Sequence, residues 1–210
     1  RRLATVNREG VCVWNTETWE QVRVIEGAWG PTAFAPDGQA IVTDSSAGLT
    51  VWPLNNPGAR VPLQNSTNLF ARGGPWFRND RVLMFSADGR QVVSARNTLS
   101  ERGVFVLGIW DARTGQETGT LPDDPEHIVH TGAISGIALS PDGRLLATAS
   151  MDRSLQVWDL NARQTVASFQ GHLAEVWAAT FASDGQTLIS GAKDGAVNLW
   201  PVNRPKKKDD

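Results

Sequence analysis

The chain has 210 residues, of which 40% are hydrophobic and 20% charged, with a formal net charge of −2. These values are ordinary for one globular domain, and the balanced charge excludes a broad basic field for nucleic acid. No apolar run is long enough to predict a membrane span. Cys12 is the only cysteine, which excludes an intrachain disulfide, so we expect a cytoplasmic protein.

Five tryptophans each close a short run of strand-forming residues: VCVW, LTVW, LGIW, LQVW and VNLW, ending at residues 14, 52, 110, 158 and 200. Between them lie four X-Asp-Gly turns, centred on Asp37, Asp88, Asp142 and Asp184. Self-similarity at about 40 residues indicates an internal repeat, which decides the fold before any local pattern does.

In chain order, the first repeat contains two expected strands, Leu3 to Asn7 and Val11 to Trp14. We therefore expect the segment Leu3 to Trp14 to form the last two strands of a partial first blade. The third repeat is lengthened by a loop-rich segment, 55–79, and by a long turn at 94–104. The linker 121–126 delays the next repeat.

The last repeat is the most regular. Val176 to Phe181, Thr187 to Ala192 and Ala196 to Trp200 are expected strands, separated by Ser183-Asp184-Gly185 and Lys193-Asp194-Gly195. Asp and Gly suit tight turns because Asp bonds the local backbone and Gly adopts positive φ. No stretch has helical periodicity with caps, so the predicted class is all-β, with antiparallel four-stranded units.

This pattern resembles the WD-repeat family of β-propellers, through Gly171-His172 followed by Asp194 and Trp200, and through Trp158-Asp159 and Trp110-Asp111. The resemblance implies an incomplete propeller of about four and a half blades over residues 1–203, followed by a charged tail, 204–210. The expected total is 18 strands. The first blade would lack its inner strand and the last its outer strand, as in the C-terminal portion of a larger propeller.

The resemblance also implies a structural hydrogen-bond tetrad in each of the last two repeats. A Ser-His-Asp set out of context suggests a hydrolase, but an active site is needed once, whereas a scaffold bond is needed in every blade. We therefore interpret both sets as structural: His130, Thr148, Asp152 and Trp158; His172, Ser190, Asp194 and Trp200.

Family members bind partners with residues beside the first strand and before the turn Asp. Carried over, these positions are Glu175, Trp177 and Lys193 in the last blade and Ala133, Ser135 and Met151 in the preceding one. We weigh a docking role for Trp177 evenly against packing on a neighbouring blade. Trp76, in the long loop of the third repeat, is a further candidate.

The expected function is a non-catalytic scaffold that binds a protein or peptide, in a larger multidomain protein. Few Lys outside the tail, no Tyr and frequent Pro-Asp-Gly point to a bacterial source. The alternatives are an enzyme with its site in the long third repeat, or an autoinhibitory lid on an upstream effector domain. No cofactor or metal is expected; loop polarity accounts for His127 beside His130 as well as a divalent site does. The open blade edges need to be covered by upstream residues or another chain. If nothing covers them, we expect the chain to self-associate.

Overall fold

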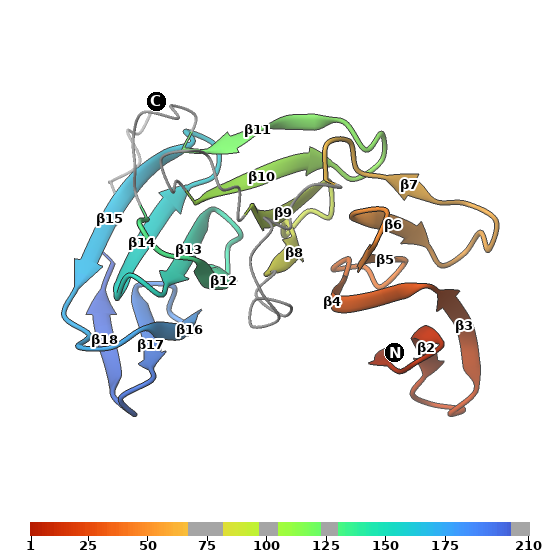
Figure 1. Ribbon diagram of the computed structural model, residues 1–210, viewed down its shortest axis with the longest axis horizontal. Helices are drawn as coiled ribbons and strands as arrows, with labels where there is room; N and C mark the ends of the chain where they lie inside the picture. Colours follow the sequence, from red (N-terminus) through yellow and green to blue (C-terminus); the bar gives the residue numbers. More distant parts are fainter. Residues whose placement is uncertain (67–81, 97–104, 123–129, 203–210) are drawn as a thin grey trace. The chain divides into compact units, whose positions relative to one another are not determined.

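A computed structural model describes residues 1–66, 82–96, 105–122 and 130–202, apart from the side chains of Trp29 and Arg96. The chain divides into two compact units, residues 1–96 with 108–119, and residues 97–107 with 120–210. Every regular element in the described ranges is a β-strand, and there are 18 of them, coloured along the chain in Figure 1. The predicted all-β class is confirmed.

The first sheet of unit 1 has three strands in the order β1-β2-β3. They are β1 (Arg2–Val6), β2 (Gly10–Asn15) and β3 (Gln21–Glu26), all antiparallel. The prediction that Leu3 to Trp14 forms the last two strands is wrong, because β3 pairs with β2. The physical reason is the turn after Asn15, whose side chain accepts hydrogen bonds from the amides of Glu17 and Thr18 and so closes a tight hairpin.

The next two sheets have four antiparallel strands each. One contains β4 (Ala28–Phe34), β5 (Ala40–Ser45), β6 (Thr50–Pro53) and β7 (Val61–Pro62). The other contains β8 (Leu83–Phe85), β9 (Gln91–Arg96), β10 (Val106–Asp111) and β11 (Glu117–Leu121). In both, the strand that follows each Trp-ended strand is the outer one, so repeat and sheet are offset by one strand.

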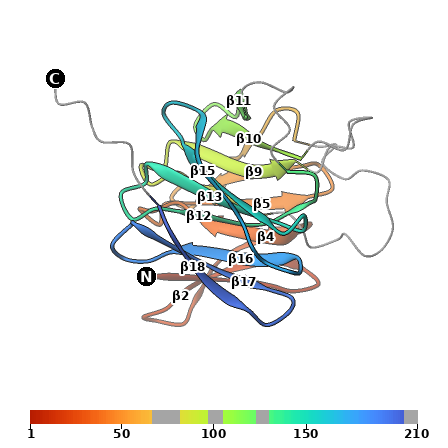
Figure 2. The ribbon, with the colours of Figure 1, turned by 90° about the vertical axis from the view of Figure 1, so that its left-hand side faces the viewer.

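Unit 2 contains one four-stranded and one three-stranded sheet. The first is built from β12 (Ile134–Leu139), β13 (Leu145–Ser150), β14 (Ser154–Asp159) and β15 (Gln164–Gln170). The second is built from β16 (Val176–Phe181), β17 (Thr187–Ala192) and β18 (Val197–Pro201), seen side by side in Figure 2. Within the described residues, this last sheet has no fourth strand after β18.

Apolar side chains on facing sheets form the core of each unit. In unit 1, Val11, Val13 and Ile25 of the first sheet pack with Ile41 of the second. In unit 2, Val176 and Leu188 pack with Leu155 and Val157 of the preceding sheet. Successive side chains of a strand point to opposite faces of the sheet, so one face of each sheet packs on this neighbour and the opposite face can pack on a second sheet.

The four predicted X-Asp-Gly turns all form, each with glycine at positive φ: 68° at Gly38, 71° at Gly89, 69° at Gly143 and 62° at Gly185. A different glycine sets a close approach between strands. Gly10 has a φ of 144°, and a Cβ there would lie 2.1 Å from the Ile25 carbonyl oxygen. Glycine at residue 10 therefore lets β2 and β3 pair at this end of the sheet.

Candidate functional site

A tight turn between β13 and β14 positions the best-formed polar network. The Arg153 amide donates to the Ser150 carbonyl at 3.1 Å, and the Ser154 amide donates to Asp152 Oδ1 at 2.9 Å. The turn requires positive φ at Arg153, which has 75°, where the last sheet has Gly195 at 81°. The Asp152 carboxylate is thereby aimed back at the segment that leads into β12.

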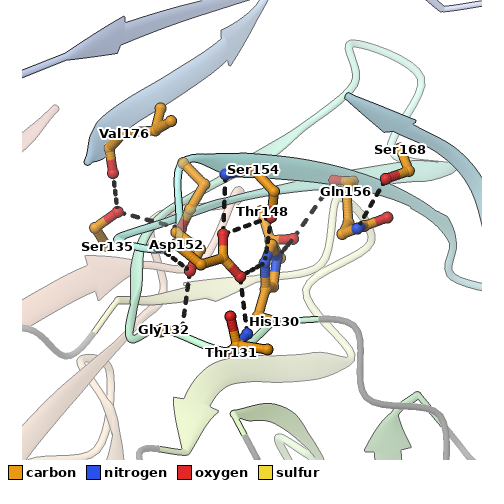
Figure 3. Close-up of polar contacts among 12 residues, drawn as sticks. His130, Thr131, Gly132, Ser135, Thr148, Asp152, Ser154, Gln156, Ser168 and Val176 are labelled. Atoms are coloured by element: carbon orange, nitrogen blue, oxygen red, sulfur yellow. Dashed lines mark hydrogen bonds and ion pairs between the residues drawn. The ribbon is translucent and has the colours of Figure 1, made fainter. Parts of the chain in front are cut away.

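His130 is the centre of this network (Figure 3). Its Nε2 lies 2.7 Å from Thr148 Oγ1, and its Nδ1 lies 3.3 Å from Asp152 Oδ2 and 3.0 Å from Ser154 Oγ. The Trp158 indole donates to Thr148 Oγ1 at 3.2 Å. His130 and Thr148 are 1% and 0% exposed, so the network satisfies buried polar groups and leaves a substrate no access to the hydroxyl.

Opposing influences act on the pKa of Asp152. Burial raises this pKa, but hydrogen bonds from the His130 ring and from the side chain and backbone of Ser154 outweigh burial and hold it well below its usual range. The Thr131 amide also donates to Oδ2 at 2.8 Å. The carboxylate therefore stays ionised at neutral pH and acts as a multiple acceptor.

This depressed pKa predicts an acid-labile contribution to stability. A group whose pKa is lower in the folded than in the unfolded chain stabilises the fold above the unfolded value, roughly pH 4 for Asp, and loses that contribution as pH falls. We expect the wild-type chain to lose stability relative to the Asp152→Asn variant below about pH 4. Urea unfolding from pH 3 to pH 7 measures this, and parallel pH profiles would contradict it.

The equivalent residues of the last sheet form only part of the network. His172 Nε2 lies 2.7 Å from Ser190 Oγ, and the Trp200 indole donates to the same oxygen at 2.8 Å. Asp194 differs from the expected tetrad. It is exposed and accepts from the Ala196 amide at 2.9 Å, as Asp152 does from Ser154, but His172 Nδ1 lies 3.5 Å from the Asn198 side-chain amide and makes no hydrogen bond to Asp194. Ala196 stands where Ser154 bridges aspartate and histidine, so the last sheet lacks the hydroxyl that ties the two together.

The Trp–hydroxyl bond extends to sheets where the sequence predicted no tetrad. The Trp14 indole donates to Thr5 Oγ1 at 2.8 Å, and the Trp52 indole donates to Thr43 Oγ1 at 2.9 Å. Sequence reasoning missed these pairs because it searched for the histidine and aspartate. A Thr or Ser nine or ten residues before the closing Trp is the signal that would have found them.

The predicted docking residues of the last sheet are largely on the surface. Trp177 is 56% exposed, and the Lys193 ammonium lies 3.2 Å from the Glu175 carboxylate, both side chains being in contact with solvent. The pKa of Glu175 is lowered, first by the hydrogen bond from its own backbone amide and then by Lys193. The Lys193 amide also donates to the Glu175 carbonyl at 3.0 Å, which brings the two loops together.

The predicted docking residues of the preceding sheet are less accessible. Ala133 is buried, Met151 is half-buried, and the Met151 amide donates to the Ala133 carbonyl at 2.9 Å. Ser135 points into the junction of the two sheets, where its hydroxyl lies beside the carbonyls of Ala149 and Val176 (Figure 3). Trp76 lies outside the described residues.

Neither a membrane-spanning helix nor a metal site is present among the residues that the structure describes. The structure contains no helix there that is long and apolar enough to cross a membrane. Among the same residues, no group of three or more His, Cys, Asp or Glu side chains is placed to hold a metal ion. His127, considered above with His130, lies outside them.

Successive antiparallel sheets of up to four strands define a repeat protein of β-propeller type. Residues 123–159 and 163–201 match the WD40 family, described as WD domain, G-beta repeat. The matched part of the chain therefore consists of two WD40 repeats, and the chain is similar to WD-repeat proteins, which are generally non-enzymatic scaffolds for protein interaction.

Curated relatives match parts of the chain. It is 33% identical over 100 residues to Pre-mRNA-processing factor 19 homolog 2 of Arabidopsis thaliana, covering 46% of this chain and 18% of the relative. It is 37% identical over 136 residues to Periodic tryptophan protein 2 of Saccharomyces cerevisiae, covering 61% of this chain and 14% of the relative. The chain thus spans less than a fifth of the length of these relatives. They are eukaryotic, and the bacterial source expected from composition stays a prediction.

Proposed function

We propose that this chain is a non-catalytic protein- or peptide-binding scaffold within a larger multidomain protein. The observation that carries the proposal is the exposed Trp177 beside the Glu175–Lys193 ion pair. An indole offers wide apolar contact with few rotamers to order, and aromatic residues are enriched in binding hot spots. The neighbouring charges would orient the partner more than they would strengthen its binding.

The burial of the His130 network supports a scaffold over a hydrolase. A nucleophilic hydroxyl must reach its substrate, and Thr148 and Ser154 are only 0% and 5% exposed. In the last sheet, Ser190 is 1% exposed, and Asp194 makes no hydrogen bond to the histidine. The long third repeat, where an enzyme site was the alternative, has part of its loop-rich segment, residues 67–79, outside the described residues.

We further propose that the remainder of a propeller covers the outward faces of the first and last sheets. In the last sheet, Val197 and Leu199 of β18 are 64% and 67% exposed, although Trp200 of the same strand packs on the preceding sheet. In the first, Leu3 is 42% exposed. A sheet face of this composition is normally buried by a neighbour.

A charge exchange tests the docking face. The double variant Glu175→Lys with Lys193→Glu keeps an ion pair between the two loops but reverses its direction. We expect unchanged thermal stability and binding to the native partner weakened about tenfold, as judged by titration calorimetry with the full-length protein. Unchanged affinity in this variant would show that the charges of Glu175 and Lys193 do not contribute to partner binding.

A further inference from the structure

Among the described residues, three hairpins have the same type of turn, in which a carboxamide or carboxylate at the first position accepts hydrogen bonds from the amides two and three residues later. The Asn15 side chain accepts from the amides of residues 17 and 18, Asp111 from 113 and 114, and Asp159 from 161 and 162. The fifth residue of each turn has positive φ: Trp19 with 57°, Gly115 with 74° and Arg163 with 53°.

Glycine suits this fifth position, because a side chain costs free energy at positive φ. Gly115 therefore represents the unstrained solution, and its amide donates to the first residue of the turn at 2.9 Å, as the Trp19 amide does at 2.8 Å. A bulky residue in this conformation is a strained outlier, and such outliers collect at functional sites.

The Trp19 side chain does not offset this strain inside the chain. It is 68% exposed, and among the described residues it has no hydrogen bond and no ring contact. By contrast, Arg163, the other non-glycine residue at the fifth position, is half-buried and interacts with other residues of the chain. The indole of Trp19 is therefore positioned for a contact outside these residues.

The surroundings of Trp19 favour a cationic partner. Glu17 and Glu20 flank it in the same hairpin, and the Thr18 hydroxyl holds Glu20 by a 3.2 Å hydrogen bond. The Glu17 side chain is 74% exposed, so its carboxylate is accessible to a partner. The Arg2 guanidinium is engaged elsewhere, donating to the Gly38 carbonyl at 2.5 Å.

We propose that the hairpin from Asn15 to Val22 docks a basic peptide segment of a partner protein, with an arginine or lysine side chain over the Trp19 indole and paired with Glu17 or Glu20. Guanidinium groups stack on indole faces and are weakly hydrated, which suits an exposed aromatic flanked by carboxylates. Val22, 44% exposed, adds apolar contact at the edge of the surface. This surface is made of residues of the first sheet and shares none with the Trp177 face, on which it does not depend.

The test uses two end-blocked peptide probes, an Arg-Gly repeat and its Glu-Gly counterpart, with the indole N–H signals of the full chain followed by NMR. We expect the Arg-Gly peptide to shift the Trp19 signal and the Glu-Gly peptide to leave it in place. Trp19→Gly should weaken Arg-Gly binding about tenfold or more, while relief of strain raises the melting temperature by roughly 2–4 °C. The control variant Trp177→Ala should leave Arg-Gly binding unchanged.

Several results would overturn the proposal. They are absence of Arg-Gly binding, equal binding by the Trp19→Gly variant, or binding of the Glu-Gly peptide in place of the Arg-Gly peptide, which would assign the surface to Arg1 and Arg2. A lower melting temperature of Trp19→Gly would show instead that the indole stabilises the fold. Because Trp177→Ala is measured in parallel, failure here is distinguishable from failure of the scaffold proposal.

Discussion

Replacing Asp152 by Ala is expected to lower the free energy of unfolding by about 2–4 kcal/mol. The carboxylate accepts hydrogen bonds from the amides of Thr131 and Ser154 and lies 3.3 Å from the His130 ring. Its side chain is only 11% exposed, so the variant leaves several polar groups without an acceptor in a site that admits little water. Urea unfolding at neutral pH measures the loss.

Asp194→Ala is the matched control, because it removes the aspartate at the same position of the next repeat. Asp194 is exposed and accepts from the Ala196 amide, so we expect a loss of less than about 1 kcal/mol. The restoring change Ala196→Ser would supply the bridging hydroxyl and should raise the cost of Asp194→Ala. Equal losses at Asp152 and Asp194 would contradict the difference that the structure shows.

Much of the fold could be predicted from the repeat. The closing tryptophans and the Asp-Gly turns indicate strands and their ends, because each is a local pattern with a local cause. Membership of β3 in the first sheet could not be read from the same pattern. Trp14 marks the end of a sequence repeat, whereas the sheet is completed by the hairpin that follows it.

The polar network was predictable in the repeat that ends at Trp158 and less so in the repeat that ends at Trp200. His130 and Thr148 meet as their spacing implies, at 2.7 Å. Asp194 does not hydrogen-bond His172, and two residues further along, at 196, a methyl group stands where Ser154 has its bridging hydroxyl. Likewise, Ser135 faces a neighbouring sheet, which depends on how two sheets stack and cannot be inferred from strand alternation within one.

Trp177→Ala should weaken binding of the native partner by about 2 kcal/mol or more, which is roughly 30-fold in affinity. The side chain lies at the start of β16, where the loop holding Glu175 and the turn holding Lys193 converge. Because more than half of the indole is exposed in the chain, truncation removes contact area from the partner and little from the core. Titration calorimetry with the full-length protein and its isolated partner measures the change, with melting temperature recorded for each variant.

The comparison of Trp177→Ala with Gln186→Ala tests the docking face most directly. Gln186 is an exposed residue at the opposite end of the same sheet, beside the Ser183-Asp184-Gly185 turn, so its truncation removes surface of similar accessibility away from the face. We predict that the affinity for the partner falls about 30-fold for Trp177→Ala and is unchanged for Gln186→Ala, with both variants as stable as the wild type. Unchanged affinity for Trp177→Ala, or an equal loss for the two variants, would contradict binding through the face that carries Glu175, Trp177 and Lys193.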